Sequence, residues 1–141
     1  TGYFMELIPE QNEHNTKDIR HVIVCSGKVY YDLIQYRETN KRNDVAIIRV
    51  EQLYPFPEDL LATELARYKN AKSIVWCQEE PKNQGAWYNV QHHIQSCLYD
   101  GQQLSYAGRL ASAAPAVGYQ TLHAKQQTAL VEEAFASVKS K

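Results

Sequence analysis

The sequence predicts an α/β fold, a mostly parallel, twisted sheet with helices on both faces. Short apolar runs rich in β-branched residues alternate four times with segments whose apolar residues recur every three or four positions. The runs are continuously apolar, which is typical of strands that are covered on both faces. Strands separated by helices favour parallel pairing through right-handed crossovers. The four runs therefore indicate one sheet between two layers of helices.

Four strands are expected from the apolar runs. They are His21–Cys25, Asp44–Val50, Ser73–Cys77 and Leu104–Ala107. The third strand is expected to end before Pro81, because proline lacks the N–H that a central strand needs.

Helices are expected between these strands and after the last one. The first three begin near Lys28, at Pro57 and at Trp87, and the third ends near Gly101. The last helix spans Leu122–Val138. Pro57 suits a helix start because its φ is already helical, and Glu58 and Asp59 then lie at the positive end of the helix dipole. The small residues of Ala111–Gly118 favour neither state and are expected to form an ordered loop.

Length and charge exclude several classes of protein. The 141 residues are most simply one domain that is long enough to bury a core. The 15 Lys and Arg nearly balance the 16 Asp and Glu, and no basic stripe indicates a nucleic acid as partner. No apolar run is long enough to cross a bilayer. We therefore expect neither a nucleic-acid partner nor a membrane partner.

The first residues are expected to connect this domain to another. The chain starts at Thr1 without an initiator Met, which suggests a piece of a longer polypeptide. Residues 1–20 show no sustained period and are expected to be a linker from a preceding domain, with an apolar start that packs against another surface. Residues 21–141 are expected to form the α/β domain.

Cysteines and histidines indicate no metal site. Cys25, Cys77 and Cys97 are odd in number and far apart, without Cys-x-x-Cys spacing, so we expect small buried side chains in a reducing compartment. His92 and His93 are neighbours in a predicted helix and point about 100° apart. They therefore cannot clamp one metal ion as an i, i+4 pair would.

A candidate anion site lies where the predicted strands end. In an open α/β sheet the carboxyl ends of the strands would bring together Ser26, Lys28, Gln52 and Arg109. Ser26 and Lys28 supply a hydroxyl and a cation at a helix N-terminus, which suits an anion. No phosphate-binding glycine motif is present, and a tight turn with Lys28 solvated or paired to a carboxylate is the alternative.

Two adjacent carboxylates, Glu79 and Glu80, follow the third predicted strand. Like charges held close would make an acid/base pair, but neighbours on an extended strand point to opposite faces. An ion pair with Arg109 or contact with a partner subunit is therefore favoured. With Trp87 and Tyr88 they form a candidate interface, since such aromatic residues are enriched in interface cores, and burial in the domain core is the alternative. No residue is assigned as catalytic, because no nucleophile has an evident base.

Four blocks of sequence, in order, carry a family resemblance. They are Cys25–Tyr31, Arg49–Pro57, Trp76–Pro81 with Asn83–Trp87, and Tyr106–Arg109 with Ser112–Tyr119. Together they resemble the C-terminal domain of the thiamine-diphosphate-dependent 2-oxoglutarate dehydrogenase component, of the transketolase-like superfamily.

The resemblance implies a fold like the C-terminal domain of transketolase and an assembly role in a homodimer, without catalysis by this part alone. The whole enzyme would decarboxylate 2-oxoglutarate oxidatively and transfer the succinyl group to lipoamide in the tricarboxylic acid cycle. Thiamine diphosphate and Mg²⁺ would be bound outside this fragment, and the dihydrolipoyl succinyltransferase core would be the partner. The location would be cytoplasmic in a bacterium or the mitochondrial matrix in a eukaryote. The related 2-oxoadipate enzymes share this architecture and stay open as an alternative.

Two further hypotheses remain. The first is a regulatory module of the same or a related 2-oxoacid dehydrogenase that binds a nucleotide or acyl-CoA phosphate at the candidate anion site. Some actinobacterial relatives that respond to acetyl-CoA carry a basic cluster after the Pro-x-Pro turn. This chain has Glu58 and Asp59 there instead, which argues against regulation by acetyl-CoA. The second, ranked last, is a freestanding hydrolase that uses Glu79 or Glu80.

Leu110 is another departure from the family, because relatives usually have Pro there, so a looser loop entry is expected.

Overall fold

A computed structural model of the chain describes residues 6–12, 15–109 and 119–136, without the side chains of residues 119–123. The strands are β1 (Leu7–Ile8), β2 (His21–Cys25), β3 (Val45–Val50), β4 (Ser73–Pro81) and β5 (Gln103–Arg109). The helices are α1 (Val29–Asn40), α2 (Glu58–Arg67), α3 (Trp87–Cys97) and α4 (Tyr119–Phe135), with a 3₁₀ turn, η1 (Thr16–Asp18). In the described residues, none of the helices is long and apolar enough to cross a membrane.

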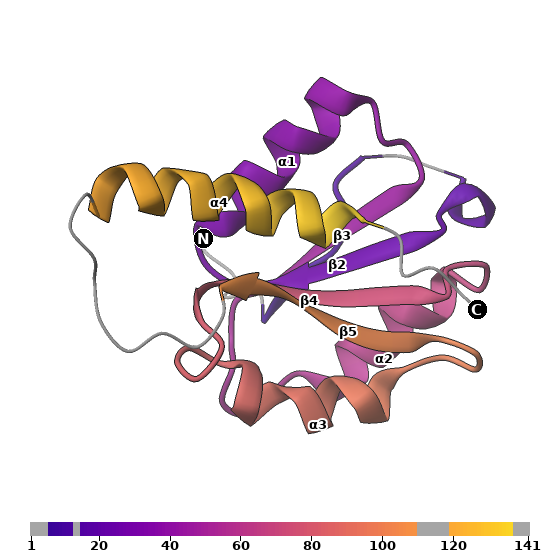
Figure 1. Cartoon of the computed structure of the whole chain (residues 1–141). Helices are drawn as coiled ribbons and strands as arrows, with labels where there is room; N and C mark the ends of the chain where they lie inside the picture. The colour runs from indigo at the N-terminus through magenta and orange to yellow at the C-terminus, as the bar shows by residue number, and fades with distance from the viewer. Residues whose placement is uncertain (1–5, 13–14, 110–118, 137–141) are drawn as a thin grey trace, which may run out of the picture.

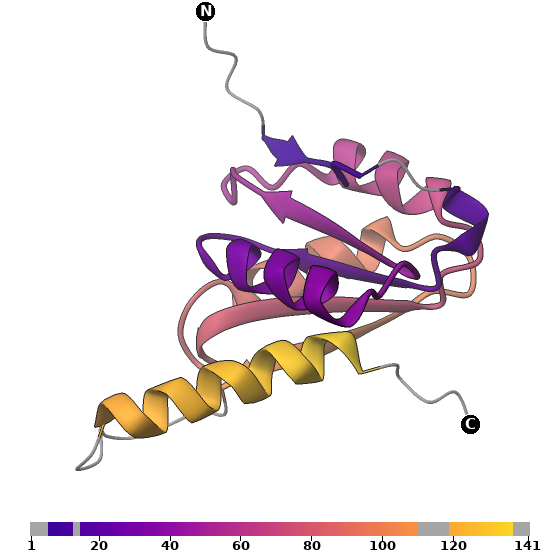
Figure 2. The ribbon, with the colours of Figure 1, turned by 90° about the horizontal axis from the view of Figure 1, so that it is seen from above.

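The strands form one mostly parallel sheet, as the sequence predicts. Their order is β1-β3-β2-β4-β5, and only the β1–β3 pair is antiparallel. Val24 at the centre of β2 lies opposite Ile48 on one side and Trp76 on the other. Figure 2 shows the strands fanned by the twist of the sheet. The predicted α/β class is confirmed.

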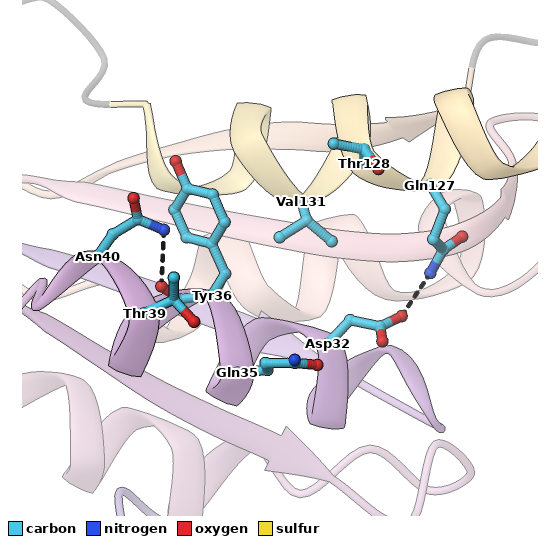
Figure 3. A pocket seen from close by; sticks show the side chains of 8 residues that line it. All are labelled: Asp32, Gln35, Tyr36, Thr39, Asn40, Gln127, Thr128 and Val131. Carbon is cyan, nitrogen blue, oxygen red and sulfur yellow. Dashed lines mark hydrogen bonds between the residues drawn. The ribbon is translucent and has the colours of Figure 1, made fainter.

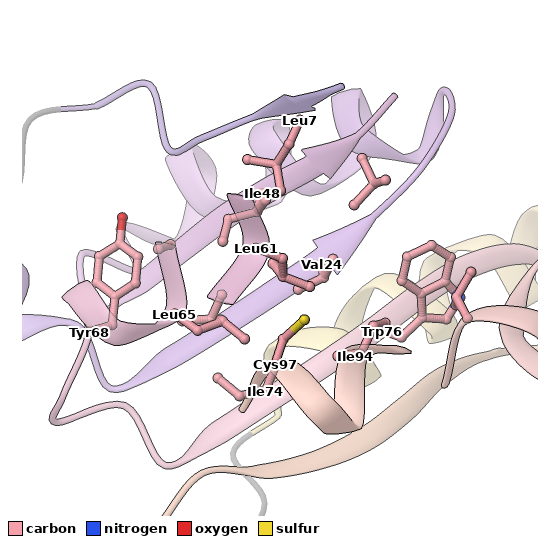
Figure 4. Packing of buried hydrophobic residues seen from close by; sticks show 14 of the residues in the cluster. Leu7, Val24, Ile48, Leu61, Leu65, Tyr68, Ile74, Trp76, Ile94 and Cys97 are labelled. Carbon is pink, nitrogen blue, oxygen red and sulfur yellow. The ribbon is translucent and has the colours of Figure 1, made fainter. Parts of the chain in front are cut away.

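Helices cover both faces of the sheet. Helices α1 and α4 lie on one face, and α2 and α3 lie on the other (Figure 1). Alternate strand residues enter the two cores: Val24 and Trp76 pack on the α2/α3 side, whereas Ile23 and Val75 pack on the α1/α4 side. Figure 4 shows the first of these cores, with Leu61 of α2 among the strand side chains. Burial on both faces explains why the strand sequences are continuously apolar.

Strands β4 and β5 both extend further than the expected Ser73–Cys77 and Leu104–Ala107. Strand β4 includes Pro81, which corrects the prediction that proline ends it. The register of β4 against β5 shifts between Cys77 and Pro81, and Pro81 then lies opposite Arg109. Strand β2 ends at Cys25, which lies opposite Cys77 of β4. Among the described strands, none therefore lies beside Pro81 on the β2 side of β4. The missing N–H of proline therefore costs no hydrogen bond with β2.

The helix ends differ modestly from the expectations. Helix α1 begins directly after Lys28, and α2 begins directly after Pro57, as predicted. Helix α3 ends at Cys97, before the expected Gly101, and α4 spans Tyr119–Phe135. The expected loop Ala111–Gly118 lies outside the described residues.

Part of the expected linker is built into the sheet. Leu7 is buried and pairs with Val50, so β1 lies along one edge of the sheet. Glu10 then forms an ion pair with Arg37 of α1. The role of residues 1–20 as a connection to a preceding domain stays a prediction.

Candidate functional site at the carboxyl ends of the strands

The order of the strands defines one preferred place for a site. Strands β2 and β4 are neighbours, but α1 follows β2 on one face and α3 follows β4 on the other (Figure 1). In open α/β sheets, a crevice forms outside the carboxyl ends of two strands whose connections diverge in this way. The polar side chains gathered there form what we call the strand-end network. Its members are Lys28, Asp32, Glu79, Arg109 and Gln127.

An ion pair spans the two diverging strands. Lys28 Nζ lies 2.8 Å from Glu79 Oε1, and the hydrogen bond and charge of Glu79 raise the pKa of Lys28. Gly27, with φ +82°, makes the turn that precedes Lys28. The Lys28 side chain is 79% exposed, so the pair contributes little stability. The structure therefore matches the alternative interpretation of this turn, in which Lys28 is paired to a carboxylate.

Gln127 of α4 joins the other members of the network. Its Nε2 donates to Asp32 Oδ2 at 2.8 Å and to Glu79 Oε1 at 3.0 Å, and its Oε1 accepts from Arg109 Nη2 at 2.8 Å. Figure 3 shows the bond between Gln127 and Asp32. One amide side chain thus connects α4 to α1, β4 and β5. Sequence reasoning missed Gln127, because a glutamine in a helix carries no motif.

Arg109 binds Glu79 in a way that differs from the expected ion pair. Its Nη1 donates to the backbone carbonyl of Glu79, while the carboxylate of Glu79 accepts from Lys28 and Gln127. Its Nε donates to Gln126 Oε1 at 3.2 Å. The guanidinium therefore holds α4 against the end of β4.

The four residues of the candidate anion site are only partly brought together. Lys28 and Arg109 both contact Glu79, whereas the Gln52 amide donates to the Pro55 carbonyl at 2.9 Å within its own loop. Ser26 is partly exposed beside Gly27. An anion that bound here would have to displace Glu79 from Lys28. Anion binding therefore stays a prediction, and the contacts among the described residues do not favour it.

A buried amide shapes the turn that follows Glu79. Gln78 is 2% exposed, and its Nε2 faces the carbonyl oxygens of Glu80, Pro81 and Gln84 at 2.8–3.1 Å. Its Oε1 accepts from Trp76 Nε1 at 2.9 Å and from the Trp87 N–H at 3.0 Å. Gln78 therefore fixes both the turn and the start of α3. Its place as the first polar residue after the apolar run of β4 is the one sequence signal for it.

The candidate interface residues fall into two groups. Trp87 is 8% exposed and packs on Tyr106, with ring centroids 5.2 Å apart, so it belongs to the domain core. Tyr88 is 55% exposed, and Glu80 is also exposed. Adjacent helical positions point in different directions, which explains why the two aromatic residues differ. Of the candidate interface residues, Tyr88 and Glu80 are thus the ones exposed to a partner, and their role in an interface stays a prediction.

The thiols and histidines are held in structural contacts. Burial raises the pKa of Cys25, of Cys77 to about 12 and of Cys97 to about 11, which disfavours the reactive thiolate. His93 contacts the Glu58 carboxylate through Nδ1 and stacks on Phe56. Within the described ranges, no group of three or more His, Cys, Asp or Glu side chains is placed to hold a metal ion.

Comparison with known proteins gives one family. The family described as "2-oxoglutarate dehydrogenase C-terminal" matches residues 1–135. A 2-oxoglutarate dehydrogenase E1 component from Cupriavidus necator is 56% identical over 98% of this chain, and one from Haemophilus influenzae is 53% identical over 95% of it. The chain spans 14% of the length of each of these relatives.

A solved structure gives the same fold at low identity. It is titled "Split gene transketolase, inactive beta4 tetramer" and superposes with a TM-score of 0.59 at 15% sequence identity. The match covers 82% of this chain and 39% of that chain. The likeness extends to the fold alone, and it agrees with the expected resemblance to the C-terminal domain of transketolase.

Proposed function

The chain belongs to the 2-oxoglutarate dehydrogenase C-terminal family, and from this premise we propose that it is the assembly domain at the C-terminus of a 2-oxoglutarate dehydrogenase E1 component. The observation that carries the proposal is the match of nearly the whole chain, at 56% identity, to only 14% of an E1 component. The strand-end network supports a structural role, because its charged groups bind one another.

The activity proposed for the whole protein is the oxidative decarboxylation of 2-oxoglutarate with transfer of the succinyl group to lipoamide. The same relatives support a dihydrolipoyl succinyltransferase core as partner, and their bacterial origin supports a cytoplasmic location. A homodimer of the full-length chain and a preceding domain joined through residues 1–20 complete the proposal.

Thiamine diphosphate and Mg²⁺ are proposed to bind other parts of the enzyme. A diphosphate–Mg²⁺ site needs oxygen ligands for the metal and cations for the phosphates. In the described part of the chain, no metal-binding cluster is formed, and Lys28 and Arg109 are both engaged by Glu79. These residues therefore do not fit the cofactor, and no step of the reaction is assigned to them.

A chimeric enzyme tests the assembly role. This chain would replace the matching 138 residues of the Cupriavidus necator E1 component, and the unaltered enzyme would be the control. The chimera is expected to keep the mass of the control in sedimentation and to turn over 2-oxoglutarate. A second variant that lacks the segment is expected to lose assembly. A chimera that folds but does not assemble would contradict the proposal.

A titration tests the absence of a catalytic role in this part. Thiamine diphosphate with Mg²⁺ would be titrated into the 141-residue chain in a calorimeter, with the full-length E1 component as positive control. No saturable heat is expected from the chain alone. Saturable binding would show that these residues hold the cofactor.

A further inference from the structure

A pocket of about 290 Å³ opens between α1 and α4. Its walls include Asp32, Tyr36 and Thr39 of α1 and Gln127, Thr128 and Val131 of α4. Figure 3 shows Tyr36 and Val131 pointing into the space between the two helices. The Tyr36 ring also packs on Phe135, with centroids 4.6 Å apart, which fixes its position. The pocket thus has an apolar side formed by an aromatic ring and an aliphatic side chain.

The charge of the pocket comes from one carboxylate. Asp32 is the only charged residue among those that line it, and the others are amides, hydroxyls and Val131. The ion pairs formed among the described residues do not include Asp32, and the nearby cation Lys28 is paired with Glu79 instead. Lys28 also interacts with Asp32 through its charge, but its hydrogen bond goes to Glu79, so no cationic head donates directly to Asp32 among the described ion pairs.

Hydrogen bonds orient Asp32 and leave it able to accept more. Both hydrogens of Gln127 Nε2 are used, one by Asp32 Oδ2 and one by Glu79 Oε1. A carboxylate offers about four acceptor positions, so Asp32 can still accept from a ligand. The Thr128 hydroxyl donates to the Ala124 carbonyl at 3.2 Å, within its own helix. The main acceptor that the pocket presents is thus the Asp32 carboxylate.

We propose that this pocket binds a lysine or arginine side chain carried by a partner polypeptide. The methylene stem would pack on Tyr36 and Val131, and the cationic head would donate to Asp32. Asp32 is the only charged side chain of the lining, and the nearby cations Lys28 and Arg109 bind Glu79 and Gln127. The negative charge of the lining favours a basic segment as the occupant. The proposal does not depend on the activity of the whole enzyme.

A blocked pentapeptide with one central arginine among alanines tests the proposal. It would be titrated into the isotopically labelled 141-residue chain, with backbone amide signals followed by NMR. Saturable shifts are expected at Asp32, Thr39 and Thr128, with a dissociation constant on the order of millimolar, because one partly exposed charged contact supplies little affinity.

Two controls make the test decisive. The same peptide with citrulline has nearly the same shape without the charge, and it is expected to bind the unaltered chain at least about tenfold more weakly. Asp32→Asn is expected to weaken the arginine peptide similarly, whereas Glu38→Gln, on the same helix but outside the pocket, is expected to leave it unchanged. Equal binding of both peptides, equal loss in both variants, or the absence of saturable shifts at the pocket would overturn the proposal. The citrulline comparison holds even if Asp32→Asn fails to fold.

Discussion

Glu10 and Arg37 form an ion pair in which each side chain is only 4% exposed. Glu10 Oε1 lies 2.5 Å from Arg37 Nη1 and also accepts the Ile47 N–H at 2.7 Å. Arg37 Nη1 donates in addition to the Val45 carbonyl at 3.1 Å. A residue of the N-terminal segment is thus locked to both α1 and β3.

Glu10→Ala is expected to lower the free energy of unfolding by about 3–5 kcal/mol, because it leaves the buried Arg37 guanidinium without its counter-charge and the Ile47 N–H without its acceptor. Urea denaturation measures the effect. Glu64→Ala serves as the control, since its partner Arg67 is 49% exposed and such pairs contribute less than about 1 kcal/mol. Equal losses in the two variants would contradict the importance of the buried pair.

Gln78→Leu is expected to destabilise the protein by about 2–4 kcal/mol. It removes the acceptor of the Trp76 and Trp87 N–H groups and the donor to three carbonyls, and buried groups without partners cost about 1–3 kcal/mol each. Thermal and urea denaturation measure the loss. Gln84→Leu is the matched control in the same turn: its side chain is exposed and only its carbonyl contacts Gln78, so a change within about 0.5 kcal/mol is expected.

Gly85→Ala is expected to be more destabilising than Gly27→Ala. Both glycines have positive φ, +69° and +82°, so both variants pay the left-handed strain of about 1–2 kcal/mol. A Cβ on Gly85 would lie 3.0 Å from Glu80 Cβ and 3.2 Å from Gln78 Nε2, whereas a Cβ on Gly27 meets nothing within 4 Å. Denaturation curves of the two variants give the difference. A Gly27→Ala variant as unstable as Gly85→Ala would show that backbone strain alone decides.

Stability is expected to fall below pH 6.5 because of His21. His21 Nε2 donates to the Ala134 carbonyl at 2.6 Å, and Nδ1 is buried without a hydrogen-bond partner among the described residues. Burial is the main cause that lowers the pKa of His21 below 6.5; Arg42 lowers it further, while the Ala134 bond and Asp44 act in the opposite direction. The native state therefore holds neutral His21, so its contribution is complete above the unfolded pKa of 6.5 and is lost as the pH falls from there through the folded pKa.

The loss is at most about 1.4 kcal/mol per pH unit for one proton. Urea denaturation at pH 7.5 and pH 5.5 measures it, and His21→Gln is expected to remove this part of the pH dependence. Arg42 lowers the pKa of Asp44 below 3.8, so the stability that this carboxylate adds is lost only in more acidic solution and does not enter the comparison. An unchanged pH dependence in His21→Gln would assign the effect to other groups.

The three thiols are expected to react slowly in the native protein. All three are buried, and a pKa of about 11 for Cys97 against an ordinary 9.0 lowers its thiolate fraction about a hundredfold near neutral pH. Titration with a disulfide reagent should count three thiols in urea and almost none at early times in buffer. Rapid reaction of one thiol in buffer would show that its helix or strand opens readily.

The apolar pattern was sufficient to predict strands β2, β3, β4 and β5 and the helix layers on either side of them. Val22–Val24 and Ile74–Trp76 are buried in the sheet, and such short, β-branched apolar runs are typical of strands covered on both faces. The antiparallel strand β1 could not be predicted, because two residues have no measurable period and Leu7 becomes buried only when β3 is in place.

The site was harder to predict than the fold for a physical reason. Lys28 and Glu79 could be placed near each other, since both follow strands that are parallel. Gln78 and Gln127 could not be assigned, because an amide gains its role from the donors and acceptors that tertiary structure brings around it. Pro81 was expected to end β4, but its place beyond the end of β2 depends on a register shift that the sequence does not show.

The position of Glu10 is also expected to limit aggregation through the edge of the sheet. An uncovered edge strand offers unpaired N–H and C=O groups to a strand of another molecule. Strand β1 covers only Arg49 and Val50 on the outer side of β3, and Glu10 takes the Ile47 N–H just beyond them. A carboxylate in that place blocks the addition of a foreign strand without adding another strand to the sheet. Loss of the short N-terminal segment would therefore expose a template for intermolecular β-pairing as well as weaken the fold.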